Sequence, residues 1–189
     1  GSEIGLRKNL AILSSISTSL DLDVQEFAQN SVASEVAKLK DLNVSNGAAL
    51  VTNPKTGEIL AMVGSRDYFD KKIDGNVNVT LALRQPGSAI KPINYAVGLS
   101  KGFTAATPFI DQKICFPNPG YPNYCPVNYD GKFHGAVQMR FALGNSFNIP
   151  AIKMLKINGV ESMITTASAM GISTFSDPSR YGLSLTLGG

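Results

Sequence analysis

Apolar residues recur at the spacing of an amphipathic helix along much of the chain. Positions three and four apart stay apolar from residue 24 to residue 40, where Asn46-Gly47 follows as a break. In front of this stretch, Asp23 followed by Glu26 predicts a capping box. Similar periodicity predicts further helices over 88–100, at about 135–144, and over 150–157 and 160–170.

Short apolar runs predict a few strands. Residues 48–52 and 58–63 are two such runs, and the segment Asn-Pro-Lys-Thr-Gly at 53–57 is a strong turn signal, so we expect a β-hairpin. Residues 18–22 alternate and predict another short strand. Residues 103–133 are rich in aromatics and prolines without a period, which predicts a long irregular segment of the kind that is usually functional or cross-linked.

The composition is that of a globular protein and excludes several kinds of chemistry. With 43% hydrophobic and 16% charged residues, the 189-residue chain can bury a core. One histidine and two cysteines are too few for the usual four-ligand zinc site, and the glycine patterns that bind nucleotide phosphates are absent. The net charge of +3 is small and the basic residues are scattered, so we expect no nucleic-acid partner. An enzyme of this composition would use serine, lysine, carboxylates and amides, without a cofactor.

A first chemical motif lies at the start of the helix predicted over 88–100. Ser88 and Lys91 are three residues apart in an S-x-x-K pattern and share one helix face. A buried lysine loses its charge more easily and can then take the proton of a serine nucleophile. Pro92 lacks the N–H that would bond to the Ser88 carbonyl, so we expect a tight first turn that leaves this carbonyl free. The alternative is a serine that only caps the helix, with a solvated lysine.

A second motif, Ser146-Phe147-Asn148, lies between two of the predicted helices. A hydroxyl and an amide separated by one residue can point the same way from a loop. The hydroxyl can relay a proton, and the amide can hold a substrate carbonyl. The alternative is ordinary capping of the two flanking helices.

The order of these motifs resembles that of the penicillin-recognising serine enzymes. The segments that flank them resemble the transpeptidase module of class A penicillin-binding proteins, and the resemblance runs from about residue 10 onward, at 18–25, 53–69, 84–92, 146–153 and 183–189. It implies an α/β fold of the β-lactamase/transpeptidase type, with helices around an antiparallel sheet of which this chain supplies only the first hairpin. We expect residues 1–17 to be a cloning scar and linker, and 18–189 to be the N-terminal portion of the domain.

The resemblance also implies a role for each motif residue. Ser88 would attack the D-Ala-D-Ala end of a peptidoglycan stem peptide and become an acyl-enzyme, with Lys91 as its general base. Ser146 would pass a proton toward the leaving D-alanine, and Asn148 would bind the amide of the substrate or of a β-lactam. The implied function is a D,D-transpeptidase that crosslinks stem peptides and is acylated by β-lactams at Ser88.

Two departures from related patterns modify this expectation. The family's third motif, K-[TS]-G, belongs beyond the second one, yet the only such string here is Lys55-Thr56-Gly57, which we interpret as a turn. We therefore expect the rest of the domain outside this chain, as a further segment or another chain, and the chain alone to be incomplete. Phe147 stands where β-lactamases carry aspartate, and no deacylation segment E-x-x-L-N follows, so stable acylation is favoured over β-lactam turnover.

The resemblance further implies a location and covalent organisation. It predicts the extracytoplasmic face of a bacterial membrane, with a glycosyltransferase module and a membrane anchor upstream, neither of them in this chain. In that compartment a disulfide between Cys115 and Cys125 is favoured over two free thiols. The single histidine, His134, is interpreted as structural or surface-exposed.

Three rival functions remain open at this point. In a D,D-carboxypeptidase or β-lactamase, water would resolve the acyl-enzyme. A truncated, non-catalytic fragment could bind penicillin or a partner without turnover. A Ser–Ser–Lys amidase also activates serine with lysine, although its glycine- and serine-rich signature is not found here.

Overall fold

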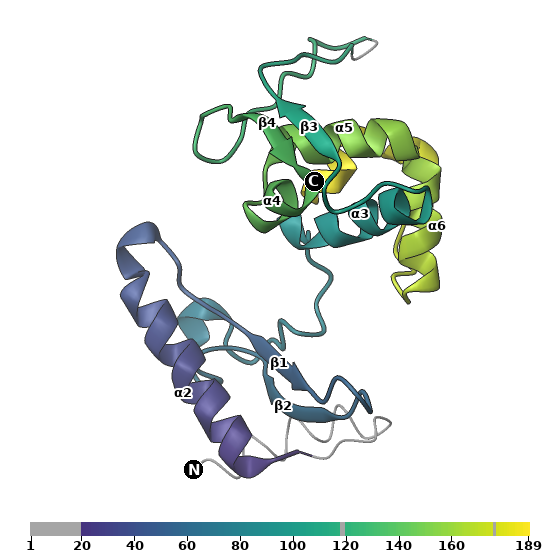
Figure 1. Ribbon diagram of the computed structural model, residues 1–189. Coiled ribbons are helices and arrows are strands. Elements are labelled where there is room, and N and C mark those ends of the chain that lie inside the picture. The colour runs from purple at the N-terminus through teal and green to yellow at the C-terminus, as the bar shows by residue number, and fades with distance from the viewer. Residues whose placement is uncertain (1–19, 118–119, 176) are drawn as a thin grey trace. The chain divides into compact units, whose positions relative to one another are not determined.

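The structure, a computed structural model, describes residues 20–117, 120–175 and 177–189, and the chain divides into two units between Leu83 and Arg84 (Figure 1). The predicted linker at 1–17 and the first two positions of the predicted strand at 18–22 lie outside the described residues. In the first unit the helices and strands are α2 (Leu22–Lys38), the 3-10 helix η1 (Lys40–Leu42), β1 (Ala49–Thr52), β2 (Ile59–Val63) and the 3-10 helix η2 (Lys71–Ile73).

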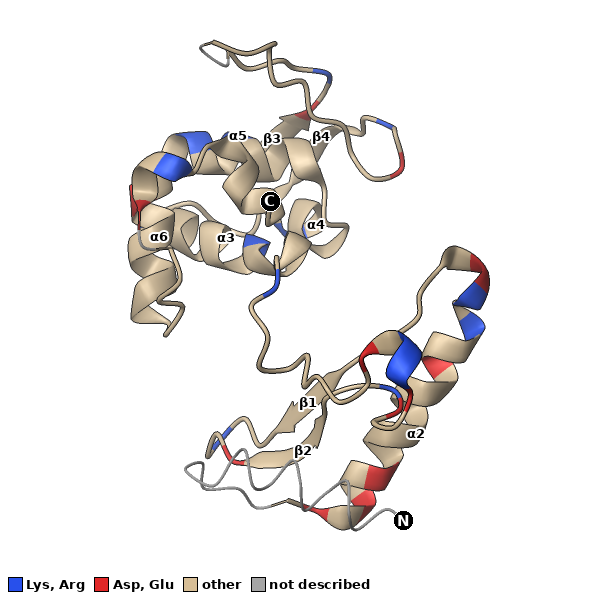
Figure 2. Ribbon diagram, turned by 180° about the vertical axis from the view of Figure 1, so that it is seen from behind, with Lys and Arg blue, Asp and Glu red and all other residues tan. Residues whose placement is uncertain are grey.

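Helix α2 begins two residues earlier than predicted and has a different cap. The side chain of Asp21 accepts a hydrogen bond from the Val24 N–H (3.1 Å), so the capping box predicted at Asp23 is wrong. Asp23 lies in the first turn and Lys38 in the last, which suits the helix dipole, and Figure 2 shows acidic positions near the start of α2 and basic ones near its end. Because Leu22 is already helical, residues 20–22 do not form the predicted strand.

The predicted hairpin is confirmed. Strands β1 and β2 pair antiparallel, and Asn53 closes the turn by donating its N–H to the Glu58 carbonyl (2.9 Å). Lys55, Thr56 and Gly57 form this turn, with Gly57 in the left-handed region at φ 77°, so their interpretation as a turn is also confirmed. On the other edge of β2, the Gln25 side chain of α2 accepts from the Met62 N–H (2.8 Å) and donates to the Met62 carbonyl (3.2 Å).

The second unit is mainly helical. Its elements are the 3-10 helix η3 (Gly87–Ile90), α3 (Lys91–Ser100), β3 (Pro108–Asp111), β4 (Gly135–Gln138), α4 (Met139–Gly144), α5 (Asn148–Asn158), α6 (Val160–Ala169), and the 3-10 helices η4 (Pro178–Arg180) and η5 (Leu183–Leu187). Figure 1 shows α3, α5 and α6 packed together, with β3 beside α5. Among the described residues, no helix is both long and apolar enough to cross a bilayer.

Helix α5 lies at the centre of this unit and packs against two clusters of buried side chains. The first cluster joins η3, α3, α5, α6 and η5 through Ile90, Ile93, Leu155, Met163, Ile164, Ala167 and Leu185. The second joins α3, β3, α4 and α5 through Tyr95, Phe109, Met139, Ala151 and Met154. Between them, the buried Asn94 donates to the Ala151 carbonyl (2.8 Å) and to Thr186 Oγ1 (2.9 Å), which ties α3 to α5 and to η5.

The helix predicted at about 135–144 is wrong over its first four residues. Residues 135–138 form β4, which pairs antiparallel with β3, and only Met139–Gly144 is helical. The partner strand lies within the segment predicted to be irregular, so a second two-stranded sheet was missed. Local periodicity does not detect a strand whose pairing partner is remote in sequence.

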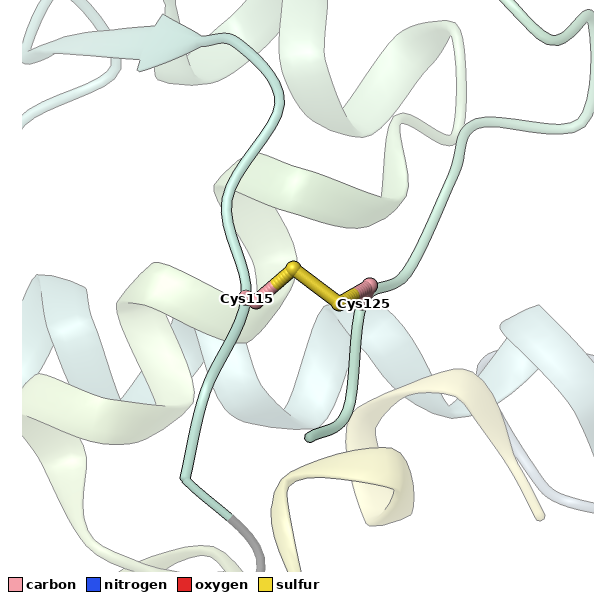
Figure 3. Close-up of a disulfide and its surroundings, with 2 residues drawn as sticks. All are labelled: Cys115 and Cys125. Carbon is pink, nitrogen blue, oxygen red and sulfur yellow. A yellow bond between two sulfur atoms is a disulfide. The ribbon is translucent and has the colours of Figure 1, made fainter. Parts of the chain in front are cut away.

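A disulfide joins Cys115 and Cys125, whose Cα atoms are 4.1 Å apart. Figure 3 shows the two cysteines on neighbouring segments of the chain. Next to it, Phe116 and Tyr124 exchange two backbone hydrogen bonds (2.8 and 2.9 Å). The long segment after β3 is therefore held by a covalent bond and a short antiparallel bridge.

Replacing both Cys115 and Cys125 by serine is expected to lower the free energy of unfolding by about 2–3 kcal/mol, because the bond restricts the unfolded chain over a loop of this size. Chemical denaturation of the oxidised protein measures the difference. As a control, dithiothreitol should bring the unaltered protein to the level of the double variant and leave the variant unchanged. Equal stability of the oxidised protein and the variant contradicts the prediction.

Candidate active site

Ser88 lies on the exposed surface in the short 3-10 helix that precedes α3. The predicted tight first turn is present, but the prediction that it frees the Ser88 carbonyl is wrong, because this carbonyl accepts the N–H of Lys91. In a 3-10 turn the donor is three residues ahead, so the missing N–H of Pro92 leaves no vacant acceptor. The Ser88 hydroxyl makes no hydrogen bond to any other described residue.

Lys91 begins α3 and is 1% exposed. Burial lowers the pKa of its amine to about 8. Its Nζ donates to the Ser146 carbonyl (2.6 Å), to Ser146 Oγ (3.0 Å) and to Asn148 Oδ1 (2.7 Å). Within the described part of the chain, no carboxylate lies at ion-pair distance from this amine. The first motif therefore supplies a buried, weakly basic amine that contacts the second motif directly.

Ser146 presents two of these acceptors because of its backbone. It follows α4 in the left-handed region, with φ 56°, a conformation that residues with a side chain rarely adopt. The Ser146 N–H donates to the Leu143 carbonyl (3.0 Å) and the Phe147 N–H to the Ala142 carbonyl (2.9 Å), which closes the end of α4. The turn thereby directs both the carbonyl and the hydroxyl of Ser146 to Lys91.

Asn148 is the first residue of α5, and both ends of its side chain have protein partners. Its Oδ1 accepts from Lys91, and its Nδ2 donates to the Val127 carbonyl (2.8 Å). An amide has two acceptor and two donor positions, so one of each remains for a substrate. The structure thus brings Ser146 and Asn148 into contact with Lys91, with Ser88 one turn from Lys91 on the same segment.

Two buried residues near the second motif were missed by the sequence analysis. Asn128 accepts the backbone N–H of Asn148 (2.7 Å) and donates to Asp111 (2.8 Å). They come from the segment predicted to be irregular, where no periodic pattern marked them. The one available signal was His134, the single histidine, whose ring also contacts Asp111.

The end of η5 lies directly against the turn that carries Ser88. A Cβ atom on Gly188 would lie 2.0 Å from the Gly87 carbonyl oxygen and 2.3 Å from its nitrogen. Gly188 also has a φ of 78°, and Gly87 one of 55°. The backbones of Gly188 and Gly87 thus lie in direct contact immediately before Ser88, so position 188 has no room for a side chain. At Gly87 a Cβ would meet no atom within 4 Å, and the left-handed backbone is what favours glycine there.

Comparisons with known proteins agree with the motif pattern. The family model described as penicillin binding protein transpeptidase domain matches residues 47–188. Penicillin-binding protein 1A of Rickettsia bellii is 37% identical over 135 residues, which cover 71% of this chain and 17% of that protein. Penicillin-binding protein 1B of Haemophilus influenzae is 35% identical over 162 residues, which cover 82% of this chain and 20% of that protein.

A solved structure shows the same likeness in three dimensions. The crystal structure of penicillin-binding protein 1A from Haemophilus influenzae has a TM-score of 0.65 and 32% sequence identity, over 76% of this chain and 21% of that one. The chain spans only about a fifth of the length of these three relatives.

Proposed function

The chain belongs to the penicillin-binding protein transpeptidase family, and we propose that it supplies the nucleophile and the base of a D,D-transpeptidase that crosslinks peptidoglycan stem peptides. The family expected from the motif order is confirmed, as is the β-lactamase/transpeptidase-like fold class. The observation that carries the proposal is Lys91, a buried amine with a lowered pKa that contacts Ser146 and Asn148 and follows Ser88 by three residues.

In the proposed first half-reaction, the hydroxyl oxygen of Ser88 attacks the carbonyl carbon between two terminal D-alanines. Neutral Lys91 takes the hydroxyl proton, and Ser146 passes a proton to the nitrogen of the departing D-alanine. The C–N bond breaks, and an ester forms on Ser88. The Ser88 N–H, near the start of a helix where such groups lack intrahelical acceptors, would stabilise the oxyanion.

In the second half-reaction, the amine of another stem peptide attacks the ester. A new amide forms, the Ser88 oxygen departs, and it takes back a proton that the amine loses. A β-lactam follows only the first half: its ring amide opens onto Ser88, and the product stays attached.

We propose that the protein acts outside the cytoplasmic membrane. The Cys115–Cys125 disulfide supports this location, because such bonds persist in oxidising compartments and are rare in the cytosol. An upstream glycosyltransferase module and a membrane anchor, implied by the resemblance, belong to the same proposal.

A fluorescent penicillin tests the proposed nucleophile. The longest natural form of the protein should be labelled at Ser88, as located by peptide mapping, and Ser88→Ala should abolish the labelling because no other group receives the acyl chain. Ser100→Ala, which removes a serine hydroxyl at the far end of α3, serves as the matched control and should label normally. Labelling that survives in Ser88→Ala contradicts the proposal.

Product analysis then separates transpeptidation from hydrolysis. With a peptide ending in D-Ala-D-Ala and an amine acceptor, the expected products are free D-alanine and the crosslinked amide. Formation of the shortened acid alone, with the acceptor present, would identify a carboxypeptidase instead.

A further inference from the structure

Asp111 and Asn128 lie in the interior beside the second motif. Asp111, the last residue of β3, is fully buried at 0% exposure, and Asn128 is 2% exposed. The Asp111 Oδ2 atom accepts from Asn128 Nδ2 (2.8 Å) and from the His134 backbone N–H (3.0 Å). It also contacts the His134 ring at Nδ1 (2.8 Å). A single carboxylate oxygen therefore contacts two residues, Asn128 and His134, of the segment between β3 and β4.

This carboxylate decides which way the Asn128 amide points. An ionised carboxylate only accepts hydrogen bonds, so the NH₂ group of Asn128 must face Asp111. The same NH₂ group also donates to the Lys132 carbonyl (2.8 Å). The oxygen of Asn128 is thereby turned to the Asn148 N–H, at 2.7 Å. A flipped amide would place two donors against each other there.

The contact from Asn128 replaces a missing helix cap. Asn148 begins α5, and its N-cap residue, Phe147, has no side chain that can accept from the first turn. Asn128 fills that role from 20 positions earlier in the chain. The N-terminus of α5, and with it the Asn148 side chain that meets Lys91, is held by a residue outside the motif.

His134, which contacts the same Asp111 carboxylate, also packs against Phe147, the middle residue of the second motif. Its ring stacks on the Phe147 ring, with centroids 4.0 Å apart and planes 14° from parallel. Its Nε2 faces Asp130 Oδ2 at 3.1 Å, so both ring nitrogens are oriented by carboxylates. Phe147 and Asn148 are consequently fixed by two branches that meet at Asp111.

The buried carboxylate of Asp111 contributes little to the stability of the fold. Its second oxygen, Oδ1, has no hydrogen-bond partner among the described residues. A buried carboxylate with an unpartnered oxygen opposes folding, and an apolar pair of similar shape would avoid that penalty. Such arrangements occur where they orient functional groups.

We propose that Asp111, acting through Asn128 and His134, is a positioning residue that sets Phe147 and Asn148 for the reaction of Ser88. The inference rests on the proposed function, because it concerns the rate at which that site is acylated. Asp111 does not touch the reacting atoms; it determines where the Asn148 amide meets Lys91. A displacement of about 1 Å in such a group can lower a rate by about a hundredfold.

The acylation rate constant of the folded protein tests the proposal. Asn128→Ala should lower this constant for a fluorescent penicillin by about 10- to 100-fold, with complete labelling still reached at long times. Asn128→Asp should be at least as slow, because it sets a second carboxylate against Asp111. Asp111→Ala removes the acceptor that Asn128 and His134 share, and it should slow acylation by a similar factor.

Asn158→Ala is the matched control. Asn158 is another buried amide, 4% exposed at the far end of α5, and it bonds to Asn94 in the core. Its removal should lower the melting temperature and leave the acylation rate constant unchanged. If Asn128→Ala yields no folded protein, Asn128→Asp, which keeps the side-chain size, decides the question.

The outcomes separate this inference from the proposed function. A normal rate constant in the Asn128 and Asp111 variants overturns the positioning role alone. Failure of the unaltered protein to become labelled at Ser88 overturns the proposed function, and the positioning role with it.

Discussion

Replacing Lys91 by methionine is expected to lower the rate constant of acylation by a β-lactam by about 10²–10⁴-fold, the usual contribution of a general base. Methionine keeps most of the volume of a side chain that is 1% exposed, so the variant removes the amine with little loss of packing. Stopped-flow or gel-based labelling of the folded fraction measures the rate constant. Lys156→Met, on the exposed side of α5, is the matched control and should react like the unaltered protein.

The pH dependence of the unaltered protein checks the same role. Burial lowers the pKa of Lys91 to about 8, and only the neutral amine can accept the Ser88 proton. The rate constant should therefore rise about tenfold per pH unit below that value and level off above it. Lys91→Met should lose this rise. A rate constant that is already flat from pH 6 to pH 9 in the unaltered protein contradicts the assignment of Lys91 as the base.

Replacing Gly188 by alanine is expected to be the most damaging change outside the motifs. The new Cβ would lie 2.0 Å from the Gly87 carbonyl oxygen, and the residue would have to keep a φ of 78°. Steric overlap of about 1–3 kcal/mol and left-handed strain of about 1–2 kcal/mol predict a combined loss of roughly 2–5 kcal/mol in unfolding free energy. Because the collision is with the residue before Ser88, labelling by penicillin should also slow. Chemical denaturation and the acylation rate constant measure the two effects.

Gly102→Ala separates the two sources of this loss. Gly102 has a φ of 92°, yet a Cβ there would meet no atom within 4 Å. This variant should lose only the backbone part and should keep its acylation rate. Equal stability losses in the two variants would show that contact with Gly87 contributes nothing.

The residues of the candidate site were predictable because they belong to short motifs. Lys91 and Ser146 are 55 positions apart, and no local pattern relates them, but each belongs to a motif whose chemistry requires the other. In the structure, Lys91 Nζ lies 3.0 Å from Ser146 Oγ. The helices α3, α5 and α6 were predictable for a different reason, because apolar residues recur at helical spacing along each of them.

One error occurred where a partner outside the local segment decides the structure: residues 135–138 form a strand because 108–111 lies beside them. The misplaced cap of α2 is a different error, because Asp21 and Asp23 both fit a local capping pattern and spacing does not rank them. Asn128 contacts the second motif through the backbone N–H of Asn148, and Asp111 contacts the NH₂ group of the Asn128 amide. Neither contact can be predicted from residue spacing or composition.

The left-handed backbone of Ser146 limits which residues can replace it. Threonine would keep the hydroxyl that contacts Lys91, but a β-branched side chain is strongly disfavoured at a φ of 56°. Glycine and asparagine accept that backbone readily and lack the hydroxyl. Serine alone meets both demands, so any substitution at position 146 gives up either the hydroxyl contact with Lys91 or the backbone conformation of the turn.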